Sequence, residues 1–207
     1  MTNLTVIKSQ TNATYDRVAT QWDTSRNKDL HERPWIDRLL AGLPTPARVL
    51  DLGCGSARPI GQYIANLRHL LTGVDASPAM IALARTHVPE ATFLEMDLTN
   101  LTLTGTFDAV LSWDGTFHLS VAEQRALLPR LAALTAPGGN LLLTIGHSEG
   151  EVTGTVAGET VYHASLHPDE YIFTLTRLGF ETVTHAADDP TTYGHHILLA
   201  TNRTAAQ

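Results

Sequence analysis

The chain has 207 residues, of which 43% are hydrophobic, and a formal net charge of −7 at pH 7. The length and hydrophobic content favour a single folded domain over residues 1–207 and exclude an intrinsically disordered chain. The acidic charge and the lack of any Lys/Arg-rich run argue against nucleic acid and membranes as partners, so we expect a small-molecule ligand.

Residues 1–42 are predicted to form a helical N-terminal cap. Tyr15 and Trp22 belong to a helical pattern over residues 14–23, and a second helical pattern covers residues 34–42. We therefore expect two helices before the first strand.

An alternation of strands and helices follows this cap. Apolar strands are predicted at residues 47–53, 69–75, 91–97, 106–113 and 140–146, with helices at about 59–67, 77–87 and 120–135 between some of them. Short strands that are apolar on both faces and separated by helices predict a parallel sheet covered by helices on both sides.

The pattern changes after the fifth strand. Residues 147–164 predict a hairpin inserted near the substrate mouth, and residues 167–179 predict a helix. The last two strands, residues 180–187 and 195–202, are too close in sequence for a helical crossover and should be antiparallel neighbours. The predicted fold is a seven-stranded, mostly parallel Rossmann-like α/β sheet with an antiparallel last strand.

Ligands of open α/β sheets bind beyond the carboxyl ends of the strands, so the polar residues that follow each strand are the candidate site. They are Asp51, Gly53 and Gly55 after the first strand, Asp75 after the second, Asp97 after the third, Ser112, Trp113 and Asp114 after the fourth, and His147 after the fifth.

The glycine-rich turn at residues 53–58 has three interpretations: a dinucleotide phosphate loop, a loop for a different ligand, or a simple connection. Arg58 occupies the third glycine position of a dinucleotide fingerprint, and the Asp51 carboxylate suits a pyrophosphate badly. A cationic or zwitterionic ligand fits better. Asp75 is placed to accept hydrogen bonds from ribose hydroxyls, although it is also placed to act in a turn that caps a helix.

Several motifs together resemble the class I S-adenosylmethionine-dependent methyltransferases. The resemblance is carried in chain order by Val49–Gly55, Gly73–Met80, Phe93–Leu98, Phe107–Val110 and Leu134–Gly139. One departure is Ala57, which stands where the family usually has a third loop glycine.

The resemblance implies S-adenosylmethionine as cofactor and a methyltransferase that acts on an oxygen or nitrogen atom of a small-molecule methyl acceptor. It implies a cofactor-binding set made up of Tyr15, Trp22, Asp51, Gly53, Cys54, Gly55, Asp75, Ala76, Met80, Asp97, Leu98, Ser112 and Trp113. Within this set Asp51 would lie near the cofactor amino group, Asp75 at the ribose, and Asp97 with Leu98 at the adenine.

Methyl transfer from a sulfonium is mainly a positioning problem, but an acceptor that loses a proton needs a general base. The candidates for this base are His118, Asp114 and His147, with His118 preferred because it follows the fourth strand. Phe117, Tyr162 and His163 are the candidate substrate contacts.

Two other functions remain open from the sequence: an NAD-linked oxidoreductase on a similar fold, and a non-catalytic methyltransferase-like binding module. The single cysteine and the histidine spacings predict no metal site. The opening residues lack the apolar region of a signal peptide, so we expect a cytoplasmic protein, as a monomer or homodimer.

Overall fold

The computed structural model describes residues 3–204. Its helices are α1 (Leu4–Ser25), α2 (Arg33–Leu40), α3 (Ile60–Asn66), α4 (Pro78–His87), α5 (Val121–Leu134) and α6 (Pro168–Arg177). Its strands are β1 (Arg48–Leu52), β2 (Leu70–Asp75), β3 (Thr92–Glu95), β4 (Phe107–Ser112), β5 (Thr135–Ile145), β6 (Gly150–Val156), β7 (Glu159–Ser165), β8 (Phe180–Asp189) and β9 (His195–Asn202). Short 3₁₀ turns cover Leu98–Asn100, Thr116–His118 and Pro190–Thr192.

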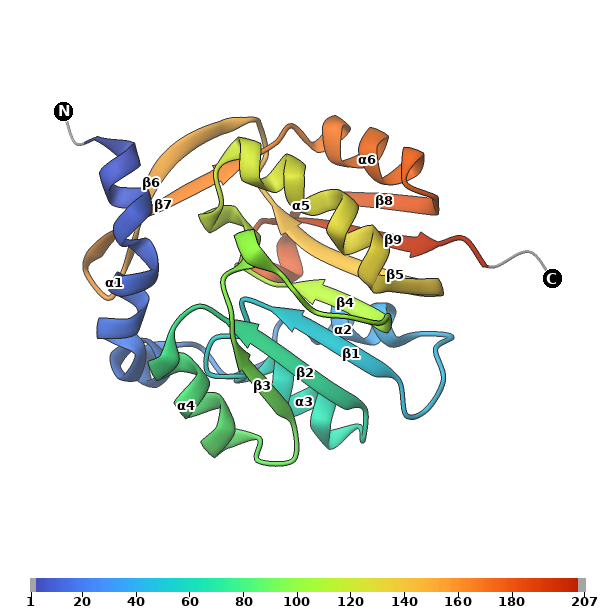
Figure 1. Ribbon diagram of the computed structural model, residues 1–207, viewed down its shortest axis with the longest axis horizontal. Coiled ribbons are helices and arrows are strands. Elements are labelled where there is room, and N and C mark those ends of the chain that lie inside the picture. Colours follow the sequence, from blue (N-terminus) through green and yellow to red (C-terminus); the bar gives the residue numbers. More distant parts are fainter. Residues whose placement is uncertain (1–2, 205–207) are drawn as a thin grey trace.

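Seven strands form one sheet in the order β3-β2-β1-β4-β5-β9-β8 (Figure 1). The strands from β3 to β5 pair in parallel, and β9 pairs antiparallel with both β5 and β8. The predicted seven-stranded, mostly parallel sheet with an antiparallel last strand is therefore confirmed. The strand order reverses between β1 and β4, which is where an open α/β sheet forms its ligand crevice.

The two faces of the sheet bury separate apolar cores. Val49 packs with α2, α3 and α4 on one face, while the next residue, Leu50, packs with α5 and α6 on the other. Leu141 and Leu142 divide in the same way between the two cores. Alternate side chains of a strand point to opposite faces, so burial on both sides explains why these strands are continuously apolar.

Helix α1 and the β6–β7 hairpin cover the carboxyl ends of the parallel strands (Figure 1). The hairpin forms its own two-stranded sheet, in agreement with the hairpin predicted within residues 147–164. Of the predicted N-terminal cap, only α1 lies over the strand ends, because Trp35, Ile36 and Leu39 of α2 are buried in a core on one face of the sheet.

Two boundaries differ from those expected. Helix α1 begins at Leu4 rather than near Tyr15, because the Asn3 side chain caps it by accepting a hydrogen bond from the Thr5 N–H. Strand β5 begins at Thr135 rather than at the predicted residue 140, and its register against β4 shifts in this added part. The ends of the predicted domain, residues 1–2 and 205–207, lie outside the described residues.

None of the helices in the described part of the chain has the length and apolar content needed to cross a membrane.

The core on the α5 side of the sheet supports a direct stability test. Leu131 is completely buried there, whereas Leu70 at the start of β2 is exposed. We expect Leu131→Ala to lower the free energy of unfolding by about 2–5 kcal/mol, through lost transfer energy and a cavity. The matched control Leu70→Ala should cost less than about 1 kcal/mol. Urea denaturation measures both, and equal losses would contradict the assignment of the core.

Candidate cofactor and substrate site

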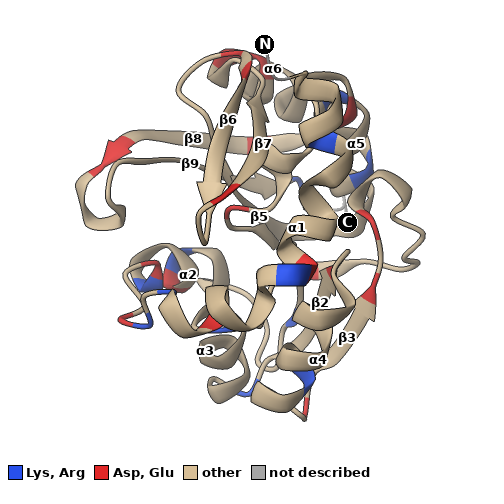
Figure 2. Ribbon diagram, turned by 90° about the vertical axis from the view of Figure 1, so that its left-hand side faces the viewer, with Lys and Arg blue, Asp and Glu red and all other residues tan. Residues whose placement is uncertain are grey.

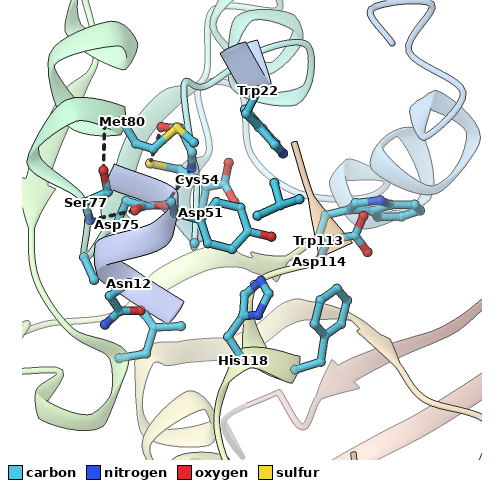
Figure 3. Close-up of a pocket in the computed structure, with 18 of the residues that line it drawn as sticks. Asn12, Trp22, Asp51, Cys54, Asp75, Ser77, Met80, Trp113, Asp114 and His118 are labelled. Atoms are coloured by element: carbon cyan, nitrogen blue, oxygen red, sulfur yellow. Dashed lines mark hydrogen bonds between the residues drawn. The ribbon is translucent and has the colours of Figure 1, made fainter. Parts of the chain in front are cut away.

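A cavity of about 270 Å³ lies where the carboxyl ends of β1, β2 and β4 meet the underside of α1. Figure 3 shows Asp51, Cys54, Asp75, Ser77 and Met80 on one side of this cavity, and Trp113, Asp114 and His118 on the other. The cavity thus occupies the crevice at the reversal of strand order, as expected for this type of sheet.

The turn after β1 is held against its neighbours by close backbone contacts. The N–H groups of Gly53 and Cys54 both donate to the Val74 carbonyl, at 2.8 and 3.0 Å. Gly53 has φ +73°, and a Cβ added there would lie 2.8 Å from the Cα of Gly115. A glycine is therefore required at residue 53 both for its conformation and for the close approach of two backbone segments.

Ala57 has φ +61° in the same turn. A left-handed conformation is ordinarily a glycine position, which gives a physical reason why the third loop residue is usually glycine. Alanine adopts it here at a cost of about 1–2 kcal/mol.

Asp51 is a buried carboxylate at the end of β1. It is 4% exposed and lines the cavity, and no hydrogen bond joins its side chain to any residue among those described. Burial and the nearby Asp75 raise the pKa of Asp51 to about 7, while Arg26 opposes this shift. An unpaired carboxyl group in such a position is suited to a ligand that brings a positive charge.

Asp75 joins the turn after β1 to the helix after β2. One of its carboxylate oxygens accepts from the Gly55 N–H and the other from the Ser77 N–H, both at 2.9 Å. Burial raises its pKa despite these hydrogen bonds. Asp75 also lines the cavity, so its structural role in the turn and a role in ligand binding are compatible.

Polar contacts attach α1 over the cavity along its length. Asn12 donates to the Asp97 carboxylate at 3.1 Å, and the Asp16 carboxylate accepts from the Ser77 hydroxyl at 2.8 Å. Near the end of α1, Ser56 donates to Asp23 at 2.5 Å. These contacts join α1 to the segments that follow β1, β2 and β3.

An aromatic group lines the other side of the cavity. The ring of His118 lies 4.9 Å from that of Tyr15 and 5.0 Å from those of Phe117 and His163. His118 Nδ1 donates to the Tyr162 carbonyl at 2.9 Å, which leaves Nε2 as the unprotonated nitrogen of a neutral ring. Burial lowers the pKa of His118 to about 4, so the ring is neutral near pH 7.

Asp114 forms an ion pair with His195 from the start of β9. His195 Nε2 lies 3.0 Å from the Asp114 carboxylate, and its Nδ1 contacts the Thr192 carbonyl. Both partners are acceptors, so both ring nitrogens donate and His195 is an imidazolium. The hydrogen bond with Asp114 raises the pKa of His195, and the same bond holds the pKa of Asp114 below its usual value against the effect of burial.

Most of the predicted site residues lie around the cavity. Of the predicted cofactor set, all but Ser112 line it, and so do Asp114, Phe117, His118 and His163. Ser112 is buried instead behind the turn, where its hydroxyl donates to the Leu52 carbonyl and accepts from the Thr116 N–H.

The other two predicted residues lie apart from the cavity. His147 is exposed and packs near His196, 6.1 Å between ring centroids. The Tyr162 side chain is buried with Ile7 beneath α1, so Tyr162 reaches the site only through its backbone carbonyl.

Sequence reasoning missed several residues of this site. Gly115 lines the cavity and packs closely against Gly53. Gly154 lies behind the cavity wall, where a Cβ would lie 2.4 Å from the His163 ring. Asn12 and Arg26 line the cavity from α1 and the residue after it. His195 pairs with Asp114, 81 positions earlier, and no local sequence pattern indicates this contact. Among the missed residues, only Gly115 carries a local signal, because it is a glycine close to the end of a strand.

Comparison with known proteins shows which proteins this chain is similar to. A family model described as "Methyltransferase domain" matches residues 49–139. The chain is 34% identical over 160 residues to a trans-aconitate 2-methyltransferase of Methylobacterium nodulans, a match that covers 70% of this chain and 59% of the relative. The chain therefore spans less than two thirds of the length of this curated relative.

Solved structures share the whole fold. A SAM-bound amino pentose methyltransferase, CalS10 of Micromonospora echinaspora, aligns with a TM-score of 0.69 and 22% identity, over 90% of this chain and 95% of the other. A complex of DhpI with SAH aligns with a TM-score of 0.72 and 23% identity, over 97% and 98% of the two chains. Through this fold, the family model and the curated relative, the chain is similar to S-adenosylmethionine-dependent methyltransferases.

Proposed function

We propose that this chain binds S-adenosylmethionine beneath α1 and transfers its methyl group to an oxygen or nitrogen atom of a small molecule. The observation that carries the proposal is the buried Asp51 carboxylate, which faces the cavity without a partner in the described chain. The amino group of the cofactor supplies the missing cation, and a carboxylate paired in this way is stable in a buried site.

The other predicted cofactor residues each contact a different part of the cofactor in this proposal. Gly53 and Gly55 let the backbone approach the methionine part, and Asp75 accepts from the ribose hydroxyls. Asp97 and Leu98 border the adenine, with the link from Asn12 to Asp97 closing that side. When bound, the cofactor supplies an activated methyl group, so the protein has chiefly to align an acceptor with it.

Three aromatic residues of the cavity wall fit the acceptor: Phe117, His118 and His163. The free Nε2 of His118 can accept a hydrogen bond from the molecule to be methylated. The Asp114 carboxylate offers a second hydrogen-bond acceptor to the same molecule. We treat residues 1–207 as one methyltransferase domain, in which α1 and the inserted hairpin enclose the acceptor.

The charge of the cavity opposes the NAD-linked alternative. A pyrophosphate would meet the Asp51 and Asp75 carboxylates, and Arg58 fills the position where a dinucleotide turn has its third glycine. Stabilisation in a thermal melt by S-adenosylhomocysteine and not by NADH is the expected result. The opposite result would favour the oxidoreductase, and stabilisation by neither would favour a module without cofactor.

The direct test is an incubation of the purified protein with methyl-labelled S-adenosylmethionine and a fractionated metabolite extract. We expect one small molecule to gain the label, and mass spectrometry identifies it. Cofactor binding without any transfer would point instead to a non-catalytic binding module.

The raised pKa of Asp51 predicts a pH-dependent affinity for the cofactor. A cationic amino group binds the ionised carboxylate, so binding below the pKa of about 7 first requires the loss of a proton. We expect S-adenosylhomocysteine to bind about 30-fold more weakly at pH 5.5 than at pH 8, as measured by titration calorimetry. Asp51→Asn should bind weakly at both pH values, while the exposed control Asp29→Asn should keep the wild-type profile.

The close contact at Gly53 predicts a second effect on binding. Gly53→Ala puts a Cβ against Gly115 and should weaken S-adenosylhomocysteine binding at least about tenfold. Gly158 in the β6–β7 turn also has a left-handed conformation, φ +85°, but nothing lies near its Cβ position. Gly158→Ala should therefore cost about 1–2 kcal/mol of stability without changing the affinity. Equal losses of affinity in the two variants would contradict this explanation.

A further inference from the structure

The wall of the cavity away from the glycine turn has its own charge pattern. We call this wall the acceptor end; it is made up of Asp114, Phe117, His118, Thr155, Val156 and His163. These residues come from the segment after β4 and from the β6–β7 hairpin. None of them is a Lys or an Arg, and the only full charge among them is the Asp114 carboxylate.

Three Lys or Arg residues line the cavity; Lys8 and Arg26 are paired with carboxylates, and Arg58 belongs to the glycine turn. Arg26 pairs with the buried Glu32 at 2.9 Å, and it donates to the Arg58 carbonyl at 3.2 Å, next to the glycine turn. Lys8 pairs with Glu123 at 2.7 Å. Figure 2 shows no Lys or Arg on the two hairpin strands, in agreement with their sequence. Within residues 3–204, no uncommitted cation is found at the acceptor end.

Asp114 and His118 present hydrogen-bond acceptors at the acceptor end, whereas the Thr155 hydroxyl and the His163 ring each also carry a donor. His118 offers its unprotonated Nε2, because its Nδ1 is bound to the Tyr162 carbonyl. The Asp114 carboxylate is fixed as an anion by the imidazolium of His195 behind it, at 3.0 Å. A group that carries N–H or O–H donors matches these two atoms, whereas a carboxylate or phosphate does not.

We propose that the methyl acceptor is a small amine, whose N–H groups are held by Asp114 and His118 while its nitrogen faces the methyl group. This inference rests on the proposed methyl transfer and names the chemical class of its acceptor. It also separates this chain from relatives that are named for trans-aconitate, an acid.

The balance of the reaction explains the role of Asp114. The lone pair of the neutral amine forms the new N–C bond as the C–S bond breaks, and the electron pair of that bond stays on sulfur. The positive charge therefore moves from sulfur to nitrogen, towards the Asp114 carboxylate, which stabilises it. The nitrogen then loses its extra proton to water. With a carboxylate as methyl acceptor, the negative charge of the substrate and the positive charge of the sulfonium cancel during transfer. No cation then forms for Asp114 to stabilise, and its carboxylate only repels the substrate.

An alcohol is a poorer match for the same reasons. Its hydroxyl has a pKa near that of water, ~16, and needs a strong base for attack. Burial lowers the pKa of His118 to about 4, and His195 keeps the pKa of Asp114 low, so neither group is such a base. A small amine is mainly protonated near pH 7, with a pKa of ~8–10, and attacks as the neutral form after the ammonium has lost a proton to water. This proton is far easier to remove than that of an alcohol, so no strong base is needed.

Binding of matched probes tests the acceptor class. The complex with S-adenosylhomocysteine is titrated with benzylamine, benzyl alcohol, benzoate and trans-aconitate, which separates binding of the acceptor class from binding of the cofactor. We expect benzylamine to bind at least about tenfold more tightly than benzoate. Equal or tighter binding of benzoate or trans-aconitate would overturn the proposal. Failure to bind S-adenosylhomocysteine in the first place would instead overturn the proposed function.

Variants and chemical blocking complete the test. Asp114→Asn should remove the preference for benzylamine with the affinity for S-adenosylhomocysteine unchanged, and the exposed control Asp188→Asn should change neither. In the labelling assay, acetylation of the amines in the extract should abolish transfer, whereas esterification of its carboxylic acids should not. Label found on an oxygen, or transfer that survives acetylation, would overturn the inference.

Discussion

A buried carboxylate without a partner is the constraint on which this site depends. Taking the charge of Asp51 out of water costs several kcal/mol, and the protein supplies no hydrogen bond within the described chain to offset it. The free protein meets this cost by holding the carboxyl protonated up to about pH 7. A ligand with a cationic group favours the ionised form of Asp51. The unfavourable burial of this carboxyl group in the free protein is thereby relieved when the ligand binds.

Helix α1 keeps water from that carboxylate, and it does so mainly through polar contacts. Its buried side chains include Thr11 and Thr14 beside Ile7 and Ala19, so its apolar contribution is small for a 22-residue helix. Instead, Asn12 donates a hydrogen bond to the segment after β3, and the Asp16 and Asp23 carboxylates accept hydrogen bonds from the segments after β2 and β1. Such contacts exchange with water more readily than a packed core does, which makes α1 the element best suited to open for ligand entry.

Local sequence signals predicted the strands and most of the cavity, because each strand end carries its own polar residues and the sheet brings those ends together. They failed where a residue acts through a distant partner. Ser112 lies at the end of β4 beside Trp113, yet its hydroxyl does not face the cavity. It donates to the Leu52 carbonyl and accepts from the Thr116 N–H. His195 lies 81 positions after Asp114 in the chain, and the antiparallel insertion of β9 beside β5 brings it to the site.

The same topology gives the two histidines, His118 and His195, different protonation states. His118 is buried against a carbonyl with no anion in contact, so it stays neutral and its Nε2 accepts hydrogen bonds. His195 lies between a carbonyl and a carboxylate, so it stays charged and fixes Asp114 as an anion. Carboxylates consequently line both sides of the cavity, Asp51 near the glycine turn and Asp114 at the acceptor end (Figure 3). A positive charge is favourable at either side, and a reaction that moves one across the cavity is stabilised throughout its course.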